Sequence, residues 1–535
     1  MMKNKLFSSP LIISCIILAI LTLSTHSSAD NVSPANPIPP STICKSTPYP
    51  GYCKSMLVPN SNSSSNAYDH SLFSVRKSLS AAQKFLSLIN KYLRGSRNLT
   101  ITAVRALEDC KFLAELNIDY LMSSFVIVNG TSSKTLSVFE ADEVQTLLSS
   151  ILTNSQTCVD GLQATASAWS VRKGILSPLT NDTRLFSVSL ALFTKAWVPK
   201  KKKPSHSTGK HLTFQNGRLN FKMSAKNQEI LNGVSNRRLL QTDDNDNQVL
   251  VSDIVVVNQN GTGNFATVND AVAAAPTNSN GSAGYFLIYI TAGVYEEYVS
   301  IANNKKYLMM IGDGINQTII TGNHSYVDGW TTFNSSTFVR NGANSSTFYS
   351  CSFEAYQDTL YVHSFRQFYR ECDIYGTVDF IFGNAAAVFQ NCNLYPRLPM
   401  PSQFNAITAQ GRTDPNQNTG IFIYNCTIRP ADDLNTTSIQ TYLGRPWKEF
   451  SRTIYMQSYI DGFINPLGWH EWSGDFALNT SYYAEFNNTG PGSNTRERVN
   501  WPGFHVINST NAANFTVATF LLGDDGRVPY EGGLL

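Results

Sequence analysis

Two aspartates, Asp358 and Asp379, stand 21 residues apart in a stretch of short apolar runs. Three cysteines repeat with nearly the same period, at separations of 21 and 20 residues: Cys351, Cys372 and Cys392. Two carboxyl groups brought close together cannot ionise equally, because the charge on one raises the pKa of the other. Such a pair supplies one acid and one base or nucleophile from a single residue type. The alternative is a pair of solvated turn aspartates, but the sequence DFIF surrounds Asp379 with large apolar groups.

A repeat of about 20 residues, rich in strand-forming residues and punctuated by Asn and Gly, is typical of a parallel β-helix. Each repeat forms one coil, and coils stack at the strand spacing of roughly 4.8 Å. One coil of rise then places Asp379 next to Asp358. The stretch 253–276 predicts a strand, a Gly-rich turn and a short helix, which would cap the first coil.

Length and composition set broader bounds. The chain has 535 residues, so we expect more than one domain. Charged residues make up 15% of it and the net charge is +3, which is compatible with a polyanionic partner. We expect no nucleic-acid partner and no cofactor. We also expect no metal, since no His/Cys cluster has the spacing of zinc ligands.

Residues 1–29 have the pattern of a secretory signal peptide, with a basic start, an apolar run over 11–23 and small residues at 27–29. The run is shorter than the ~20 apolar residues of a membrane span. We therefore expect a soluble, exported mature chain, and an uncleaved signal anchor is the alternative. Several Asn-x-Ser/Thr sequons predict glycosylated surface loops, among them Asn98, Asn181, Asn260 and Asn487.

The region 41–196 predicts a helical bundle. Apolar residues recur three and four positions apart over 71–93, 99–121 and 141–168, and a last helical stretch ends at 196. Nine cysteines are present and one leaves with the signal, so an even number remains, which predicts disulfides in an exported chain. They divide into four in the bundle and four later: Cys44, Cys53, Cys110 and Cys158, then Cys351, Cys372, Cys392 and Cys426.

Residues 197–248 have the composition of a linker. A lysine run over 200–203 is followed by Pro, Ser and Gly and then by acidic, Asn-rich sequence, which we expect to stay mobile. The lysine run is more simply a solvated segment than a polyanion-binding site. The basic sequence RRLL at 237–240 lies in this segment, where proteolytic cleavage is physically easy.

The segments QDTLYVHS, GTVDFIFGNA and LGRPW resemble those of plant pectin methylesterases (pectinesterases). The helical region with its four cysteines resembles the pectin methylesterase inhibitor domain. The resemblance implies an inhibitor-like four-helix bundle over 41–196 and a linker over 197–248 with a processing site at 237–240. It also implies a catalytic right-handed parallel β-helix over 249–535. In this family the bundle cysteines pair first with second and third with fourth, which gives Cys44–Cys53 and Cys110–Cys158.

By this resemblance, Asp379 is the nucleophile that attacks the methyl-ester carbonyl of a galacturonate unit. Asp358 gives a proton to the leaving methanol and later takes one from water. Gln357 offers an amide N–H to the oxyanion. Arg445 keeps Asp379 ionised through a charge-assisted hydrogen bond.

The same resemblance places substrate contacts. Trp447 stacks on a sugar ring and Thr332 touches the substrate, while Tyr356 and Phe380 either line the cleft or only pack. The implied substrate is methylated pectin in the cell wall, and the implied product besides methanol is pectate. A further implied partner is the chain's own inhibitor-like domain.

The sequence departs from the family after Phe338. The family continues there through another coil that carries a glutamine for the oxyanion, whereas this chain passes directly to VRNG and then to STFYSC. About one coil of some two dozen residues is absent. Because each coil of a solenoid contacts only its neighbours, we expect the strands on either side to stack across the gap.

Several alternatives stay open. In the second cysteine group, Cys372–Cys392 is one possible disulfide, Cys351–Cys372 with Cys392–Cys426 is another, and stacked free thiols are the third. The function is that of a pectinesterase, of a weak or inactive homologue that binds pectin or acts as an inhibitor-like protein, or of another β-helix polysaccharide enzyme. A lyase commonly needs a Ca²⁺ carboxylate cluster, which does not stand out, and a glycosidase does not predict QDTL together with LGRPW.

Overall fold

The computed structural model describes residues 33–60, 63–95, 99–130, 136–164, 169–198, 214–215, 218–234, 240–241, 249–279, 282–302, 304–322, 324, 330–331, 333, 338–340 and 346–521. The predicted signal peptide, Thr332, Asn98 and the two arginines of RRLL lie outside the described residues. None of the helices within these ranges is both long and apolar enough to cross a bilayer.

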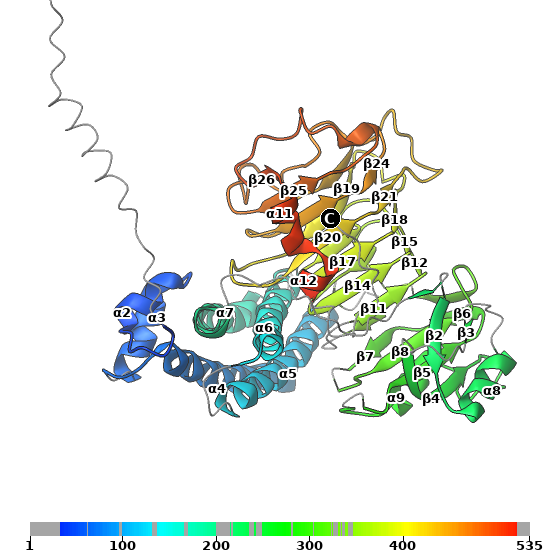
Figure 1. The fold of residues 1–535 in the computed structure, drawn as a ribbon. Helices are drawn as coiled ribbons and strands as arrows, with labels where there is room; N and C mark the ends of the chain where they lie inside the picture. The colour runs from blue at the N-terminus through cyan, green and yellow to red at the C-terminus, as the bar shows by residue number, and fades with distance from the viewer. Residues whose placement is uncertain are drawn as a thin grey trace, which may run out of the picture.

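The first part of the chain is a four-helix bundle (Figure 1). Its helices are α4 (Ala67–Arg94), α5 (Ile101–Gly130), α6 (Val138–Ala164) and α7 (Trp169–Trp197), preceded by the short α2 (Pro40–Ile43) and α3 (Pro50–Leu57). Helices α4 and α6 each pack on both α5 and α7. At the start of α4, Asn66 and Asp69 accept hydrogen bonds from each other's backbone N–H, which satisfies two donors of the first turn. The predicted bundle is confirmed.

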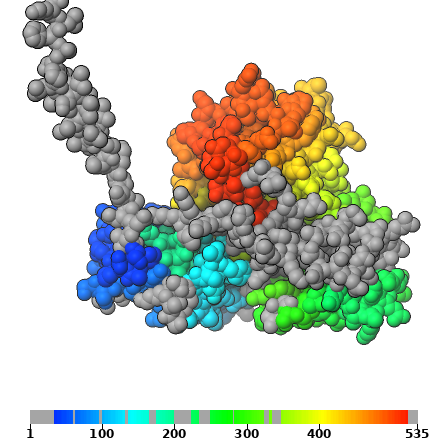
Figure 2. Space-filling view, in the orientation of Figure 1, coloured from blue at the N-terminus to red at the C-terminus, as the bar shows by residue number. Residues whose placement is uncertain are grey.

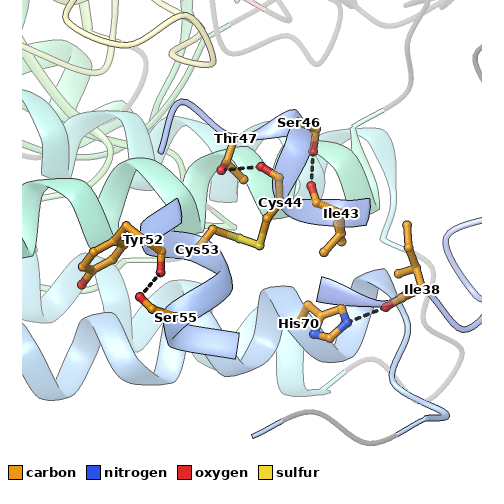
Figure 3. Close-up of a disulfide and its surroundings, with 9 residues drawn as sticks. All are labelled: Ile38, Ile43, Cys44, Ser46, Thr47, Tyr52, Cys53, Ser55 and His70. Atoms are coloured by element: carbon orange, nitrogen blue, oxygen red, sulfur yellow. Dashed lines mark hydrogen bonds between the residues drawn. A yellow bond between two sulfur atoms is a disulfide. The ribbon is translucent and has the colours of Figure 1, made fainter. Parts of the chain in front are cut away.

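Two disulfides hold the bundle, with the pairing that the family resemblance implies. Cys44–Cys53 joins the turn after α2 to α3, and Figure 3 shows it beside the His70 side chain, whose Nε2 lies 2.9 Å from the Ile38 carbonyl oxygen. Cys110–Cys158 ties α5 to α6 in their buried middle. Both pairings are therefore as predicted.

The segment that we expected to remain a mobile linker contains regular structure. It holds β1 (Phe214–Gln215), β2 (Arg218–Lys222), α8 (Ala225–Val234) and β3 (Leu240–Gln241). Strand β2 pairs in parallel with β4 (Val249–Val257), and α8 buries Leu231 among core residues of β4 and of β5 (Tyr285–Ile290). The flanking lysines and asparagines are typical of a linker, but the segment also contains apolar residues. Of these, Met223 and Leu231 pack on the β-sheet.

Residues 249–340 form the first part of the β-helix, here called the N-terminal stack (green in Figure 1). Its strands pair in parallel as β4–β5–β8, β6–β9 and β7–β10. Helix α9 (Val268–Ala274) closes its end, with Thr267 as N-cap and the Glu297 carboxylate accepting from the first backbone N–H groups. The strands are β4 (Val249–Val257), β5 (Tyr285–Ile290), β6 (Gly293–Glu296), β7 (Val299–Ile301), β8 (Leu308–Gly312), β9 (Thr318–Thr321) and β10 (Phe338–Arg340).

Residues 346–521 form the second part, the C-terminal stack (yellow to red in Figure 1). Three parallel sheets run in the orders β11-β14-β17-β20-β23-β25-β26, β12-β15-β18-β21-β24 and β13-β16-β19-β22. This is the predicted parallel β-helix. The strands are β11 (Ser346–Tyr349), β12 (Ser352–Glu354), β13 (Leu360–Tyr361), β14 (Arg366–Arg370), β15 (Asp373–Gly376), β16 (Ile381–Gly383), β17 (Ala386–Gln390), β18 (Asn393–Pro396), β19 (Asn405–Gln410), β20 (Gly420–Tyr424), β21 (Thr427–Ile428), β22 (Thr441–Gly444), β23 (Arg452–Met456), β24 (Tyr459–Ile460), β25 (Tyr482–Phe486) and β26 (Phe504–Val506).

The coils turn at one recurrent left-handed position between the first and second sheets. Six successive coils place a non-glycine residue there with φ between 48° and 55°: Ser350, Glu371, Asn391, Asn425, Gln457 and Asn487. Asparagine tolerates this conformation best among residues with a side chain, which explains the Asn punctuation in the sequence. Short helices α11 (Ser509–Ala512) and α12 (Val517–Leu521) pack on the outside of the first sheet.

The β-helix is interrupted between the two stacks. Among the described residues, no strand of the N-terminal stack pairs with a strand of the C-terminal stack: β10 pairs with β7, while β11, β12 and β13 each begin a separate sheet. The expectation that the coils stack directly across the gap after Phe338 was therefore wrong. Strand β10 pairs with β7 of its own stack, and β11 pairs with β14 of the next stack. The ladder of hydrogen bonds therefore starts again at β11.

Candidate active site

The two aspartates lie at equivalent positions on neighbouring coils. The register that pairs Leu360 with Ile381 sets Asp358, two residues before Leu360, beside Asp379, two residues before Ile381. The Asp358 N–H donates to the Val378 carbonyl at 3.0 Å, and both aspartates have a left-handed backbone, with φ of 56° and 55°. The one-coil spacing inferred from the 21-residue interval is thus realised.

Arg445 donates two hydrogen bonds to the Asp379 carboxylate. Its Nε lies 2.8 Å from Oδ1 and its Nη2 lies 2.7 Å from Oδ2. The guanidinium is itself held between two aromatic rings, with its carbon 4.4 Å from the Trp472 ring centre and 5.3 Å from that of Phe404. A bidentate, charge-assisted pair of this kind orients the carboxylate as well as stabilising its charge.

The pair has two different electrostatic environments. Burial, followed by the charge of Asp379, raises the pKa of Asp358 to about 7, and Arg445 opposes the rise only from a distance. Because the Asp358 side chain also meets solvent, water screens part of this repulsion. Burial raises the pKa of Asp379 too, but there the direct hydrogen bonds and charge of Arg445 pull it down. We therefore assign the proton to Asp358 and the charge to Asp379 near neutral pH.

The raised pKa of Asp358 makes a stability prediction. Between the ordinary carboxyl pKa of 3.8 and about 7, the unfolded chain is ionised at this position while the folded chain keeps the proton. Stability is therefore lost as the pH rises through this window. We expect Asp358→Asn to remove this loss, so that the variant melts above the wild type at pH 8 and at the same temperature near pH 4. Melting curves at both pH values check this, and an equal difference at both would contradict it.

Trp447 lies two residues after Arg445 and is partly buried. Its ring centre is 5.9 Å from that of Phe382 and 6.5 Å from that of Tyr361, both in edge-to-face geometry. A Cβ atom at Gly411 would lie 2.8 Å from the indole, so only glycine lets the ring rest on that backbone. The neighbouring coils therefore fix the orientation of Trp447.

The other predicted residues are less tightly placed. Gln357 is exposed beside Asp358, on the first coil of the C-terminal stack. Tyr356 is also exposed, and the Arg397 guanidinium lies 4.4 Å from its ring centre. Phe380 is fully buried in the core, so its role is packing. The oxyanion donor and the sugar contacts remain predictions.

Sequence reasoning missed the aromatic pair around Arg445. Phe404 lies 41 residues before Arg445 and Trp472 lies 27 residues after it, so only the stacking of coils brings the two rings to the guanidinium. The sequence GWHEW shows only that Trp472 follows Trp469 by three residues, and the structure shows that Trp469 is buried and Trp472 exposed. Phe404 carried no signal either.

The four later cysteines form a column through successive coils. In the structure Cys351, Cys372, Cys392 and Cys426 are free thiols, so the predicted Cys372–Cys392 disulfide is not formed. Burial raises the pKa of both Cys372 and Cys392 well above the usual range, and neighbouring thiols share hydrogen bonds. A buried protonated thiol behaves as a small apolar side chain. The stacked-thiol alternative is the one that the structure contains.

One polar face of α6 contacts the C-terminal stack. Thr157 Oγ1 lies 2.9 Å from His363 Nε2, and the Asn384 side chain donates to Thr153 Oγ1 at 2.9 Å. Near Trp447, the Lys448 ammonium pairs with Asp160 at 2.9 Å. In the view of Figure 2 the bundle (blue to cyan) lies below the C-terminal stack (yellow to red).

A buried ion pair lies at the other end of the contact between α6 and the C-terminal stack. Arg366 of β14 lies 2.8 Å from Asp142 of α6, and the two side chains are 1% and 3% exposed. Breaking such a pair on one side typically costs about 3–5 kcal/mol. The ion pair therefore holds the helical bundle against the coils that carry the two aspartates.

Comparison with known proteins identifies relatives of both parts. The family model described as pectinesterase matches residues 254–345 and 339–524, and the one described as plant invertase/pectin methylesterase inhibitor matches residues 40–192. The two pectinesterase matches meet at 339–345, where the strand ladder restarts.

Similar whole chains come from two plants. A probable pectinesterase/pectinesterase inhibitor 7 of Arabidopsis thaliana is 58% identical, over 92% of this chain and 95% of the relative. Pectinesterase 2 of Citrus sinensis is 41% identical, over 92% and 93%. The solved pectin methylesterase from carrot is 45% identical and matches with a TM-score of 0.49, over 55% of this chain and all of its own.

Proposed function

The chain belongs to the pectinesterase family and carries an inhibitor-type domain, and from this premise we propose that it hydrolyses methyl esters of cell-wall homogalacturonan to pectate and methanol. The observation that carries the proposal is the pair of aspartates on adjacent coils, of which one is held by a bidentate arginine and the other has a pKa near 7. This arrangement supplies a nucleophile and an acid in one place.

The reaction proceeds in two halves. A carboxylate oxygen of Asp379 attacks the methyl-ester carbonyl carbon, and the resulting oxyanion accepts a hydrogen bond from the Gln357 amide. The C–O bond to methanol breaks while the Asp358 proton moves to the departing oxygen. Water then attacks the acyl-enzyme and gives a proton to the Asp358 carboxylate, and the product acid leaves as Asp379 is regenerated.

Methanol release from methylated homogalacturonan tests this proposal. We expect release from the methylated polymer and none from the same polymer after chemical de-esterification. Unsaturated or shortened sugar products without methanol would instead identify a lyase or glycosidase. Binding of pectin without any methanol would favour the weak or inactive homologue, a candidate supported by the interrupted strand ladder beside Asp358.

We further propose that the protein acts outside the cell, in the wall. The signal-like segment 1–29 and the two disulfides of the bundle support export, because disulfides persist in oxidising compartments. There the bundle acts as an intramolecular inhibitor, which is supported by the contact of α6 with the coils around Trp447. The substrate would have to compete with this face.

Processing at 237–240 gives a testable product. If the basic site is used, protein extracted from the wall begins near Gln241. N-terminal sequencing of that protein is the measurement, and a variant with both arginines of the site changed to alanine is the control, which we expect to begin near Asp30. Wild-type chains that all begin near Asp30 would show that the site is not cut.

A further inference from the structure

Each stack of the β-helix contributes one buried aromatic residue to the apolar core of the bundle. Apolar side chains of α4–α7 cluster with Phe333, which precedes β10 of the N-terminal stack, and with Phe365, which precedes β14 of the C-terminal stack. None of the other clusters of described residues contains residues of both stacks. The bundle core is thus the place where apolar residues of both stacks meet.

One face of α5 holds the N-terminal side. Its residues 105, 109 and 112 are spaced by four and three positions, so they project from one side of the helix. The Arg105 guanidinium lies 3.7 Å from the ring centre of Trp330, and the Thr331 hydroxyl donates to Asp109. The ring centres of Phe112 and Phe333 are 6.3 Å apart.

Stacked rings connect this contact to the body of the N-terminal stack. The Trp330 ring lies 3.6 Å from that of His324, and His324 lies 3.6 Å from Tyr298, in the loop between β6 and β7. Arg105 therefore ends a column of flat groups that reaches from the bundle into the stack. Cation–π contacts of this kind contribute about 0.5–2 kcal/mol each.

The same face of α5 continues to the C-terminal side. Tyr120, two turns beyond Phe112, meets Phe365 edge-to-face at 5.0 Å, and Phe333 meets His363 in the same way at 5.3 Å. From residue 105 to residue 120 the helix spans about 22 Å at 1.5 Å per residue. This length lets one rigid element touch both stacks. The Cys110–Cys158 disulfide joins this helix to α6, which holds Arg366 and Asn384.

We propose that the α5/α6 face is a docking surface whose partner is the split β-helix of the same chain, and that it clamps the two stacks together where their described strands do not pair. In place of backbone hydrogen bonds between strands, three kinds of contact hold the stacks. They are the apolar core of the bundle, the stacked rings that end at Arg105, and the buried ion pair of Arg366 with Asp142. In this chain the bundle is therefore part of the architecture of the enzyme domain. This role is independent of whether the protein hydrolyses methyl esters.

The test measures the distance between the two stacks in the full chain. Spin labels are attached through a keto amino acid at Val294 on β6 and at Met400 after β18, because these side chains are 55% and 73% exposed and the native thiols then stay unlabelled. We expect one narrow distance distribution in the wild type. Arg105→Ala with Phe112→Ala removes two contacts to the N-terminal stack, and we expect the distribution to become broad.

The matched control is Met122→Ala with Val126→Ala on the same helix, whose side chains are 51% and 68% exposed. We expect this variant to keep the narrow distribution. Circular dichroism reports whether each variant keeps its helices. A distribution that stays narrow in Arg105→Ala/Phe112→Ala, with helices intact or lost, would overturn the proposal, since the connection through β10 would then suffice. Broadening in the control as well would also overturn it, because the effect would not depend on the docking face.

Discussion

Asp379→Asn is expected to abolish methanol release. The substitution keeps the size of the side chain but replaces the nucleophilic carboxylate by an amide, which cannot form the acyl-enzyme. Loss of a hydrolase nucleophile lowers the rate by on the order of 10⁴ to 10⁶. One of the two acceptors for Arg445 also disappears, so the guanidinium loses its bidentate partner.

The measurement is methanol release by wild type and variant at equal concentrations of folded protein. Asp373→Asn is the matched control, because Asp373 lies on the same coil, and its amide oxygen could still accept the hydrogen bond from Asn393. We expect the control to retain normal release. Normal release by Asp379→Asn would remove this residue from the reaction and with it the proposed acyl-enzyme.

Inserting a family-like coil after Phe338 is expected to raise the rate by on the order of 10² to 10³, the usual contribution of one oxyanion donor. Asp358 and Gln357 lie on the first coil of the C-terminal stack, and among the described strands that coil pairs only with the coil that follows it. An inserted coil would pair with β11–β13, add a wall beside these residues and bring the family's glutamine. Better positioning of the ester would add to the gain.

A second insertion, with the coil glutamine changed to alanine, separates the two effects. We expect it to regain the wall but not the donor, so its rate should lie between those of the other two proteins. Methanol release by all three, beside their circular dichroism spectra, makes the comparison. Equal rates for the natural chain and the full insertion would show that Gln357 and the existing donors suffice.

The proposed inhibitory role of the bundle and its proposed structural role make opposite demands on processing. As an inhibitor, the bundle must leave before substrate can enter near Trp447. As a clamp, it must stay to keep the stacks together. Cleavage at 237–240 also separates β2 and α8 from β4, although they pack on it. Under the clamp proposal, a chain cut at 237–240 keeps its bundle bound by the α5/α6 face.

The sequence by itself determined the local and periodic features. The three- and four-residue apolar spacing specifies the helices of the bundle, because it encodes one buried face for each helix. The period of about 20 residues specifies the coils, and the side chain at a given coil position meets its counterpart one period later. For this reason the juxtaposition of Asp358 and Asp379 could be predicted from their numbers alone.

Only the tertiary structure decided what depends on stacking over several coils or on competition between partners. Arg445 lies 66 residues from Asp379, and its aromatic neighbours come from two further segments, so no local period links them. The spacing of the four later cysteines does not reveal whether they form disulfides, and in the structure they are thiols. The gap after Phe338 was visible in the sequence, but its outcome was not. Whether two strands pair across a gap depends on the free energy of that pairing relative to the other contacts that the strands can make. In this chain β10 pairs with β7, and the core of the bundle contains a residue from each stack.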